Sequence, residues 1–237
     1  MMKAVILAAG EGSRISSLTR KIPKPMIKYN GKPILEHNIE LCKKNGITEI
    51  FINTHHLADI IKNYFGNGNR WGVNIHYSYE KELLGTASAL VSFKDHLKDD
   101  SFFVIYGDNY SQFDIISLKE KAKEVNSMGI IAFHYREDVS TSGVANFDDD
   151  GAIISFIEKP KEGETNSNWV NAGMYFFDKE IFDVIPNKFG DFGRDIFPML
   201  LRNKVPLYGV CNKSEVRAFD TPDMLKINNI DYNEVEK

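Results

Sequence analysis

A glycine-rich segment near the N-terminus carries the clearest potential for chemistry. Gly10 and Gly12 follow a short apolar run, and the cations Arg14 and Lys24 come soon after, Lys24 between two prolines. Glycines at such a turn let backbone N–H groups approach phosphate oxygens closely. A dinucleotide fingerprint would need a third glycine where Ile15 stands, and the Gly-Lys-Ser/Thr of a Walker A loop is absent. We therefore predict a triphosphate-binding loop, with a plain strand-to-helix turn as the alternative.

One aspartate is a candidate ligand of a divalent cation. Asp108 follows the apolar strand expected at residues 102–106, at the carboxyl end where open α/β sheets bind their ligands. One or two carboxylates together with substrate phosphates form the coordination that Mg²⁺ prefers. The alternative is that Asp108 caps a turn.

Apolar periodicity predicts the elements that position these side chains. In the first half of the chain, short β-rich runs alternate with helical stretches, which is typical of a mainly parallel sheet covered on both faces. The second half is richer in strands, and residues 150–151 are expected to close a hairpin. We expect Thr86 to cap a helix that runs to Phe93, and Thr221 to cap the last helix. The other expected elements are strands at residues 3–8, 49–53, 73–79, 102–106, 130–135, 143–147, 153–157, 172–177 and 206–210, and helices at 33–44, 57–65 and 195–201.

Composition limits the class of protein. Of the 237 residues, 43% are hydrophobic and 26% charged, as in ordinary globular domains, and we expect a single domain with halves of about 1–110 and 111–237. The 29 Lys+Arg and 33 Asp+Glu give a net charge of −4 without a dense basic patch, so neither nucleic acid nor a membrane is an expected partner. No apolar run approaches the roughly 20 residues of a membrane span. Cys42 and Cys211 lack metal-ligand spacing, so we expect free thiols and a cytoplasmic location.

Several motifs, taken together and in order, resemble those of the sugar-1-phosphate nucleotidyltransferases, and of the mannose-1-phosphate guanylyltransferase type in particular. They are the loop and Pro-Lys-Pro of residues 10–25, Glu-x-x-x-Leu-Gly-Thr-Ala at 80–87, Gly-Asp at 107–108, Ser-Gly-Val at 142–144, Phe-Ile-Glu-Lys-Pro at 156–160 and Asn-Ala-Gly at 171–173. The resemblance covers nearly the whole chain. It implies a Rossmann-like α/β fold of the nucleotidyltransferase or GT-A-like kind, with a mixed, mostly parallel sheet and helices on both faces. It also implies transfer of a nucleoside monophosphate from an NTP to a sugar 1-phosphate, with release of pyrophosphate.

The resemblance further implies roles for particular residues. Arg14, Lys24, Asp108 and Lys159 would be catalytic, with Lys159 gripping the sugar phosphate, and Asp108 and Asp220 would hold Mg²⁺. The residues implied to bind the nucleotide are Leu7, Ala8, Ala9, Gly10, Gly12, Ser13, Glu80, Gly85 and Thr86. Those implied to bind the sugar phosphate are Gly143, Glu158, Lys159 and Asn171. For Lys159 the alternative is an exposed hairpin lysine.

Two departures from the family pattern affect these roles. The late family motif usually reads Trp-x-Asp-x-Gly-Thr-Pro, and Ala218 occupies the position of its Asp. Asp220 matches an Asp-Thr-Pro variant of the wider superfamily instead, which leaves the second metal ligand open between metal binding and helix capping. Ser17 stands where the family generally has proline, a change expected to affect the stiffness of the loop more than its chemistry.

Glu80 bears on the choice of base. An ionised carboxylate offers only acceptors, which suit the adjacent N1–H and N2–H₂ donors of guanine better than uracil or thymine, while the amino group of cytosine also fits. The alternative is a solvated residue at the end of a strand. We therefore expect GTP and mannose or heptose 1-phosphate, for capsule, lipopolysaccharide or glycoprotein synthesis, in a chain compatible with a homodimer and without an appended β-helix domain. The rivals are a cytidylyltransferase acting on a small phosphorylated metabolite and a catalytically silent regulatory subunit of the same fold.

Overall fold

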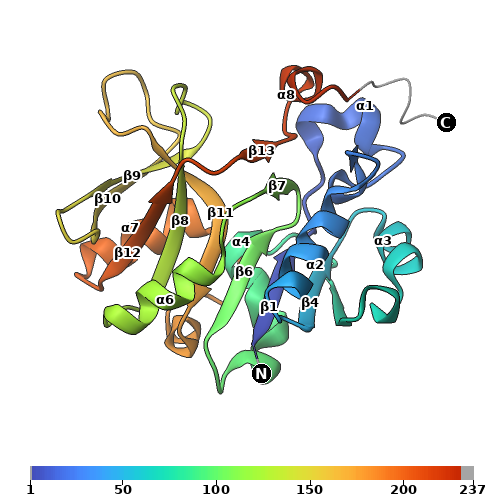
Figure 1. Cartoon of the computed structure of the whole chain (residues 1–237), viewed down its shortest axis with the longest axis horizontal. Coiled ribbons are helices and arrows are strands. Elements are labelled where there is room, and N and C mark those ends of the chain that lie inside the picture. The colour runs from blue at the N-terminus through green and yellow to red at the C-terminus, as the bar shows by residue number, and fades with distance from the viewer. Residues whose placement is uncertain (1, 231–237) are drawn as a thin grey trace. The chain divides into compact units, whose positions relative to one another are not determined.

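The computed structural model describes residues 2–230, which form two compact units (Figure 1). Within that range, unit 1 contains residues 2–83, Ile105–Ser111 and 216–230, and unit 2 contains Leu84–Val104 and Gln112–Glu215. Neither unit is a simple half of the chain, because residues 84–104 belong to unit 2 and residues 216–230 belong to unit 1. No helix in the described part combines the length and the apolar character that crossing a membrane requires.

Unit 1 is built on parallel strands. Strand β1 (Lys3–Leu7) pairs with β4 (Glu49–Thr54), and β4 pairs with β5 (Asn74–Tyr79), in both cases in parallel. Strand β6 (Phe102–Tyr106) is next to β1, and its last two residues belong to unit 1. Almost every residue of β1 and β4 is buried, as expected for mainly apolar strands in a sheet that is covered on both faces. Unit 1 also contains the helices α2 (Ile34–Lys44) and α3 (Ala58–Phe65), whose bounds are close to the predicted ranges.

Short elements at the N- and C-terminal ends of unit 1 share one apolar cluster. Ile15, Leu18, Ile27, Ile34, Phe219 and Leu225 are its buried members. Since Phe219 and Leu225 come from the last described segment, this cluster holds that segment against the glycine-rich loop. Thr221 accepts a hydrogen bond from the Met224 N–H and caps α8 (Pro222–Ile227), as predicted. The remaining short elements are η1 (Ser13–Ile15), α1 (Ser16–Thr19), η2 (Lys24–Met26), β2 (Lys28–Tyr29), β3 (Lys32–Pro33), η3 (Asn69–Trp71), β7 (Asn109–Ser111) and β13 (Val216–Ala218).

Unit 2 combines parallel and antiparallel strands. Strand β8 (Gly129–Tyr135) pairs with β11 (Trp169–Phe177) antiparallel and with β12 (Leu207–Asn212) in parallel. Strands β9 (Gly143–Phe147) and β10 (Ile153–Glu158) form the predicted antiparallel hairpin, and Val144 of β9 pairs with Val170 of β11. The helical elements of unit 2 are α4 (Gly85–Ser88), η4 (Ala89–Phe93), α5 (Lys94–Leu97), α6 (Ile116–Glu124), η5 (Lys179–Asp183), η6 (Phe192–Ile196) and α7 (Phe197–Arg202). The predicted fold class, a mixed and mostly parallel α/β sheet, is confirmed.

One predicted element is wrong. The sequence predicts a single helix capped by Thr86, whereas the structure has the short helix α4 followed by the 3-10 helix η4. Leu84 is the residue before α4, and no side chain caps it. The hydroxyl of Thr86 instead donates to the Asp191 carboxylate, 2.9 Å away, and accepts from the Phe192 N–H. Thr86 therefore bonds to residues more than 100 positions further along the chain and does not cap the helix.

Candidate functional site

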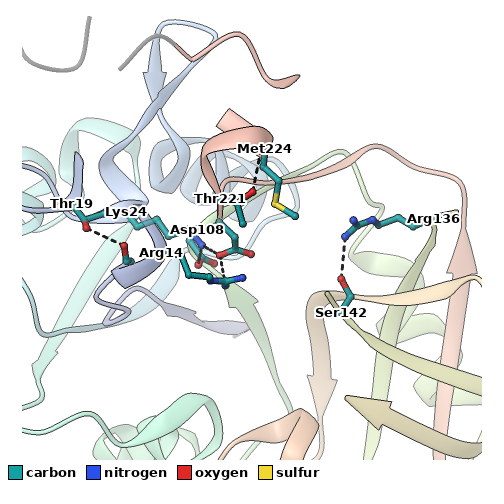
Figure 2. A network of polar contacts seen from close by, with 10 residues as sticks. Arg14, Thr19, Lys24, Asp108, Arg136, Ser142, Thr221 and Met224 are labelled. Carbon is teal, nitrogen blue, oxygen red and sulfur yellow. Dashed lines mark hydrogen bonds and ion pairs between the residues drawn. The ribbon is translucent and has the colours of Figure 1, made fainter. Parts of the chain in front are cut away.

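The glycine-rich loop follows β1 in unit 1. Gly12 has a φ of 64°, a backbone conformation that side-chain-bearing residues rarely adopt, and a Cβ there would lie 2.5 Å from Cγ2 of Thr19. The Thr19 hydroxyl donates to the Gly12 carbonyl oxygen (Figure 2). At Gly10, by contrast, no atom of residues 2–230 apart from its chain neighbours lies within 4 Å of where a Cβ would stand. The loop is therefore packed at Gly12 and open at Gly10, where a ligand can approach the backbone.

Four charged side chains meet beside this loop. The Lys24 ammonium group donates to Oδ2 of Asp108 at 2.5 Å and also to Oδ1 of Asp220 (Figure 2). The Arg14 guanidinium lies 3.0 Å from the same Asp220 oxygen. We call Arg14, Lys24, Asp108 and Asp220 the ion-pair network. All four were predicted from the sequence as phosphate-binding or metal-binding residues, and the structure brings them together.

Lys24 is the buried centre of the network, since only 4% of its surface is exposed. Burial alone lowers the pKa of a lysine, because the charged form is poorly solvated. Here the carboxylates of Asp108 and Asp220 outweigh burial and raise the pKa of Lys24 above its ordinary value. The ammonium group is thus a fixed positive charge at neutral pH.

Buried backbone on either side holds the two carboxylates in place. Asp108 follows Gly107, whose N–H donates to the Leu7 carbonyl at the end of β1, and a Cβ at Gly107 would lie 2.9 Å from that oxygen. Asp220 stands between the fully buried Phe219 and the cap residue Thr221. Because Thr221 caps α8, the alternative of Asp220 as helix cap does not hold, and its carboxylate turns to Lys24 and Arg14.

Glu80 is a buried side chain of unit 1, with 4% of its surface exposed. The Asn53 amide donates to Oε1 of Glu80 at 2.7 Å and accepts from the Ala8 N–H at 2.8 Å. The alternative of a solvated residue at a strand end is therefore wrong. The chain of bonds ties Glu80 to the end of β1, where Leu7, Ala8 and Ala9 lead into the glycine-rich loop.

Two neighbouring histidines support the same region through the backbone. His55 Nδ1 is 2.8 Å from the Glu80 carbonyl oxygen, and His56 Nε2 is 2.6 Å from that of Thr19. Their ring nitrogens thus serve structural hydrogen bonds in the loop before α3.

Unit 2 contains the residues that the sequence assigned to the sugar phosphate. Gly143 of β9 pairs with Glu158 of β10, and a Cβ at Gly143 would lie 2.7 Å from Oε2 of Glu158. A Cβ at Gly193 would lie 2.6 Å from the same oxygen, so the carboxylate fits over two glycines. Burial raises the pKa of Glu158, as does the charge of Asp191, while Lys159 and Arg194 act in the opposite direction.

Lys159 has an unusual backbone. Its φ is 54°, although it is not a glycine, and its N–H donates to the Ser142 carbonyl oxygen at 3.0 Å. A non-glycine residue in this region is strained, and such residues concentrate at functional sites. Ser142 also accepts from the Arg136 guanidinium at 3.1 Å (Figure 2), so the turn that carries Lys159 is tied to the end of β8.

Asn171 and the segment of Gly85 and Thr86 are held by contacts inside unit 2. The Asn171 amide donates to the Tyr175 hydroxyl at 2.8 Å and accepts from the Gly173 N–H, across the irregular part of β11. Gly85 has a φ of 81° and packs on the Gly190 carbonyl oxygen, which accepts from the Ala87 N–H.

Sequence reasoning missed Asp191 and left the role of Arg194 open. Asp191 receives hydrogen bonds from the N–H groups of Gly193 and Arg194 and from the Thr86 hydroxyl. In the sequence, Asp191 stands next to the Phe-Gly-Arg-Asp run of residues 192–195, which carries no motif that points to this role. A surface loop with one acidic residue gives no local sign that it will meet residues 84–88.

Comparisons with known proteins identify the family of the chain. The chain matches the nucleotidyl transferase family over residues 3–216. It belongs to that family. A UTP–glucose-1-phosphate uridylyltransferase of Synechocystis is 38% identical over 223 residues, which are 88% of this chain and 58% of that protein. A D-glycero-α-D-manno-heptose 1-phosphate guanylyltransferase of Campylobacter jejuni is 35% identical over 184 residues, 77% of this chain and 78% of that protein.

A solved structure gives the same picture for the fold. A Bacillus anthracis protein assigned as a glucose-1-phosphate thymidylyltransferase has a TM-score of 0.86 and 28% identity, covering 97% of this chain and 94% of that one. These relatives are named as sugar-1-phosphate nucleotidyltransferases, so the resemblance found in the motifs is confirmed. The chain spans little more than half the length of the Synechocystis relative, and the relatives differ in the base they are named for.

Proposed function

We propose that this chain transfers a nucleoside monophosphate from an NTP to a sugar 1-phosphate and releases pyrophosphate. GTP is the favoured NTP, and mannose or heptose 1-phosphate the favoured sugar. The observation that carries the proposal is the ion-pair network, which places Arg14 and Lys24 beside two carboxylates next to an open glycine-rich loop. This set of groups fits a triphosphate, which needs cations and backbone N–H donors.

The two carboxylates of the network fit a divalent cation. Asp108 and Asp220 both reach one ammonium group, so their oxygens converge on one point, as two ligands of a single ion must. Among the described residues no cluster of three or more His, Cys, Asp or Glu side chains is arranged for a metal, so the other ligands would be phosphate oxygens and water. Mg²⁺ prefers that kind of site. When bound, it would neutralise charge that develops on the departing pyrophosphate.

The proposed reaction asks the protein mainly for position and charge. A phosphate oxygen of the sugar 1-phosphate attacks the α-phosphorus, a new P–O bond forms, and the bond to the β-phosphate oxygen breaks with its electron pair leaving on pyrophosphate. The second pKa of a phosphate monoester is near ~6, so the nucleophile is ionised at neutral pH and no strong general base is needed. Lys24 would hold the reacting phosphates and Arg14 the β- and γ-phosphates, in exchange for their contacts with Asp220.

Unit 2 would bind the second substrate. Lys159 and Arg194 are two cations whose charges act on Glu158, and they suit the sugar phosphate. The Glu158 carboxylate would accept hydrogen bonds from sugar hydroxyls, and the Asn171 amide would donate hydrogen bonds to them. Placing Gly85 and Thr86 at the nucleotide remains a proposal from the family resemblance.

A cytidylyltransferase is the second candidate. The buried carboxylate of Glu80 offers acceptors, which fit the amino group of cytosine as well as the donors of guanine. The Asp-Thr-Pro variant at residues 220–222 also supports this candidate.

The test is a scan of pyrophosphate release. Each of GTP, CTP, UTP and dTTP is paired with mannose, glucose and heptose 1-phosphates and with phosphocholine. We expect the highest kcat/KM with GTP and mannose or heptose 1-phosphate. Turnover with CTP alone would replace the guanine assignment by the cytidylyltransferase, and turnover with UTP or dTTP alone would refute the argument from Glu80. The absence of release with every pair would favour a regulatory subunit without catalysis.

A further inference from the structure

A cleft opens in unit 2 where its strands separate. Strands β9 and β11 share a single pair of partners, Val144 and Val170, and β11 shifts register against β8 between Asn171 and Tyr175. The turn of the β9–β10 hairpin reaches β12 instead, where Ala152 bridges Tyr208. Strand residues and the neighbouring residues 166–168 and Lys213 border an open space of about 740 Å³, a volume within the range of small-molecule sites. We call it the hairpin cleft.

Aromatic and apolar side chains line part of the hairpin cleft. Trp169 at the start of β11 pairs with Tyr135 at the end of β8, and their rings meet edge to face at 5.9 Å. Tyr135 is 45% exposed, and the Lys213 ammonium group lies 5.5 Å from the centre of its ring. Aromatic side chains of this kind combine a large apolar surface with a polar end. They can pack against the C–H face of a sugar ring.

Side-chain amides and hydroxyls line the rest of the cleft. The Asn146 amide donates to the Ser155 hydroxyl at 2.8 Å, which leaves the Asn146 carbonyl oxygen and the Ser155 proton for a ligand. The Asn168 amide donates to the Arg136 carbonyl oxygen at 2.8 Å through its nitrogen, which leaves its oxygen as an acceptor for a ligand. Asn166 is exposed, and within residues 2–230 its side chain has no protein partner. The cleft therefore presents both donors and acceptors.

The charge of the lining residues further limits the class of ligand that the cleft can bind. No carboxylate lines the cleft among the described residues, and Lys213 is its one cation there. A nucleotide or a sugar phosphate would call for several cations, as the ion-pair network has. Neutral amides and hydroxyls beside aromatic rings instead match a polyhydroxylated, uncharged ligand.

We propose that the hairpin cleft is a binding site for a neutral saccharide of one or two pyranose rings. It is a separate site from the residues proposed for the sugar phosphate. The Asn146–Ser155 pair lies toward the turn of the hairpin, whereas the Gly143–Glu158 pair lies at its other end. The site does not depend on the proposed nucleotidyl transfer, because it takes its ligand without a phosphate and without a nucleotide.

Trp169 makes the test direct. The chain has two tryptophans, so Trp71→Phe leaves Trp169 as the one indole reporter. The full-length variant is titrated with methyl α-D-mannopyranoside, methyl α-D-glucopyranoside and maltose up to about 100 mM, far above a millimolar Kd. We expect a saturable change in Trp169 emission with at least one of them. Tyr135→Ala and, separately, Asn166→Ala in the same background should raise the Kd at least about 10-fold.

The controls separate this site from the proposed sugar-phosphate site. Lys159→Ala in the Trp71→Phe background should leave the Kd unchanged, and its loss of binding would assign the saccharide to the other end of the hairpin and overturn the proposal. A response that is equal in the parent, Tyr135→Ala and Asn166→Ala proteins would overturn it too, as would no saturable response to any of the three saccharides. Asn166 is exposed, so its variant decides the matter even if Tyr135→Ala fails to fold. An emission change on dilution without saccharide would show that a second copy of the chain covers the cleft, and would also overturn the proposal.

Discussion

Lys24 and its two carboxylates place opposite demands on a buried site. A lone ammonium group with 4% exposure would be costly to bury, yet two carboxylates that are each partly exposed keep it charged. In the proposed reaction, phosphates would replace the carboxylates as partners of the cations, and Mg²⁺ would replace the cations as partner of the carboxylates. The charged side chains would then already be in place when the substrates bind, which would reduce the rearrangement needed.

Replacing Asp108 by asparagine tests this proposal. Asp108→Asn keeps the size of the side chain and removes the charge, so it should lower kcat at least about 100-fold by analogy with other single electrostatic groups. Steady-state pyrophosphate release measures the effect, and circular dichroism checks the fold. The matched control is Asp59→Asn on α3, an exposed aspartate, which should retain the parent kcat. A near-normal kcat for Asp108→Asn would show that the metal is placed wrongly.

Glu80 gives a second prediction, on the choice of base. Glu80→Gln can keep the hydrogen bond from Asn53 through its amide oxygen, but it adds an N–H₂ donor. Uracil and thymine present carbonyl acceptors, so the ratio of kcat/KM for GTP to that for UTP should fall about 10-fold or more. Glu82→Gln, two residues on and exposed, is the control that should leave the ratio unchanged. An equal ratio in both variants would remove Glu80 from the proposed base site.

Lys159 can be tested against a lysine on the same turn. Lys159→Ala should raise KM for the sugar 1-phosphate about 10-fold or more, because a charge-assisted contact with phosphate is lost, and leave KM for the NTP near its parent value. Lys161→Ala removes an exposed lysine two residues on and should change neither constant. If both variants keep the parent kcat/KM for the sugar phosphate, Lys159 is an exposed hairpin lysine, the alternative considered from the sequence.

At the scale of secondary structure, local signals predicted the elements that depend on nearby residues. Strand β6 and strand β9 have the predicted bounds, and Thr221 caps α8, because apolar runs and a Thr-Pro pair act within a few residues. The helix expected after Thr86 failed for the opposite reason. Gly190 and Asp191 hold Gly85 and Thr86 from about 105 residues away, which no local pattern encodes. The burial of Glu80 by Asn53 was hidden from the sequence in the same way.

The contact between Thr86 and the 190–192 segment predicts a measurable stability. Thr86→Val keeps the shape of the side chain but leaves the Phe192 N–H without its acceptor and removes one of the three donors to the Asp191 carboxylate. Losing such bonds costs about 1–3 kcal/mol, which urea unfolding would measure. Amide hydrogen exchange should quicken at residues 190–194. Thr141→Val, an exposed threonine of the same unit, should match the parent in both measurements, and an equally stable Thr86→Val would show that the contact is not structural.

At the scale of the whole chain, the residues that matter most come from distant parts of the sequence. Among the described residues, unit 1 contains residues 2–83, 105–111 and 216–230. The ion-pair network needs all three segments, because Lys24, Asp108 and Asp220 lie on one each. The sequence predicted the members of the network through their motifs, while the buried Phe219 and Leu225, which bring Asp220 to the loop, could be recognised only in the structure.

Global stability should depend on pH through His134. This residue is 7% exposed in β8, and burial lowers its pKa to about 4, with a further contribution from Arg136. The ordinary pKa is 6.5, so the unfolded chain binds a proton that the folded chain refuses between pH 6.5 and 4, and stability is full above pH 6.5 and lost as the pH falls. Between pH 8 and 5 this single group should cost about 2 kcal/mol of unfolding free energy.

The measurement is urea unfolding at pH 8 and pH 5 for the parent and for His134→Gln, which does not titrate. Other groups titrate in the same range, so the quantity that counts is the difference between the two proteins in the change from pH 8 to pH 5. His96→Gln, at an exposed position of α5, should lose as much stability as the parent does. If His134→Gln also loses as much stability as the parent, the prediction is wrong. The imidazole would then reach water in the folded chain, although His134 lies between its strand partners Val170 and Asn212.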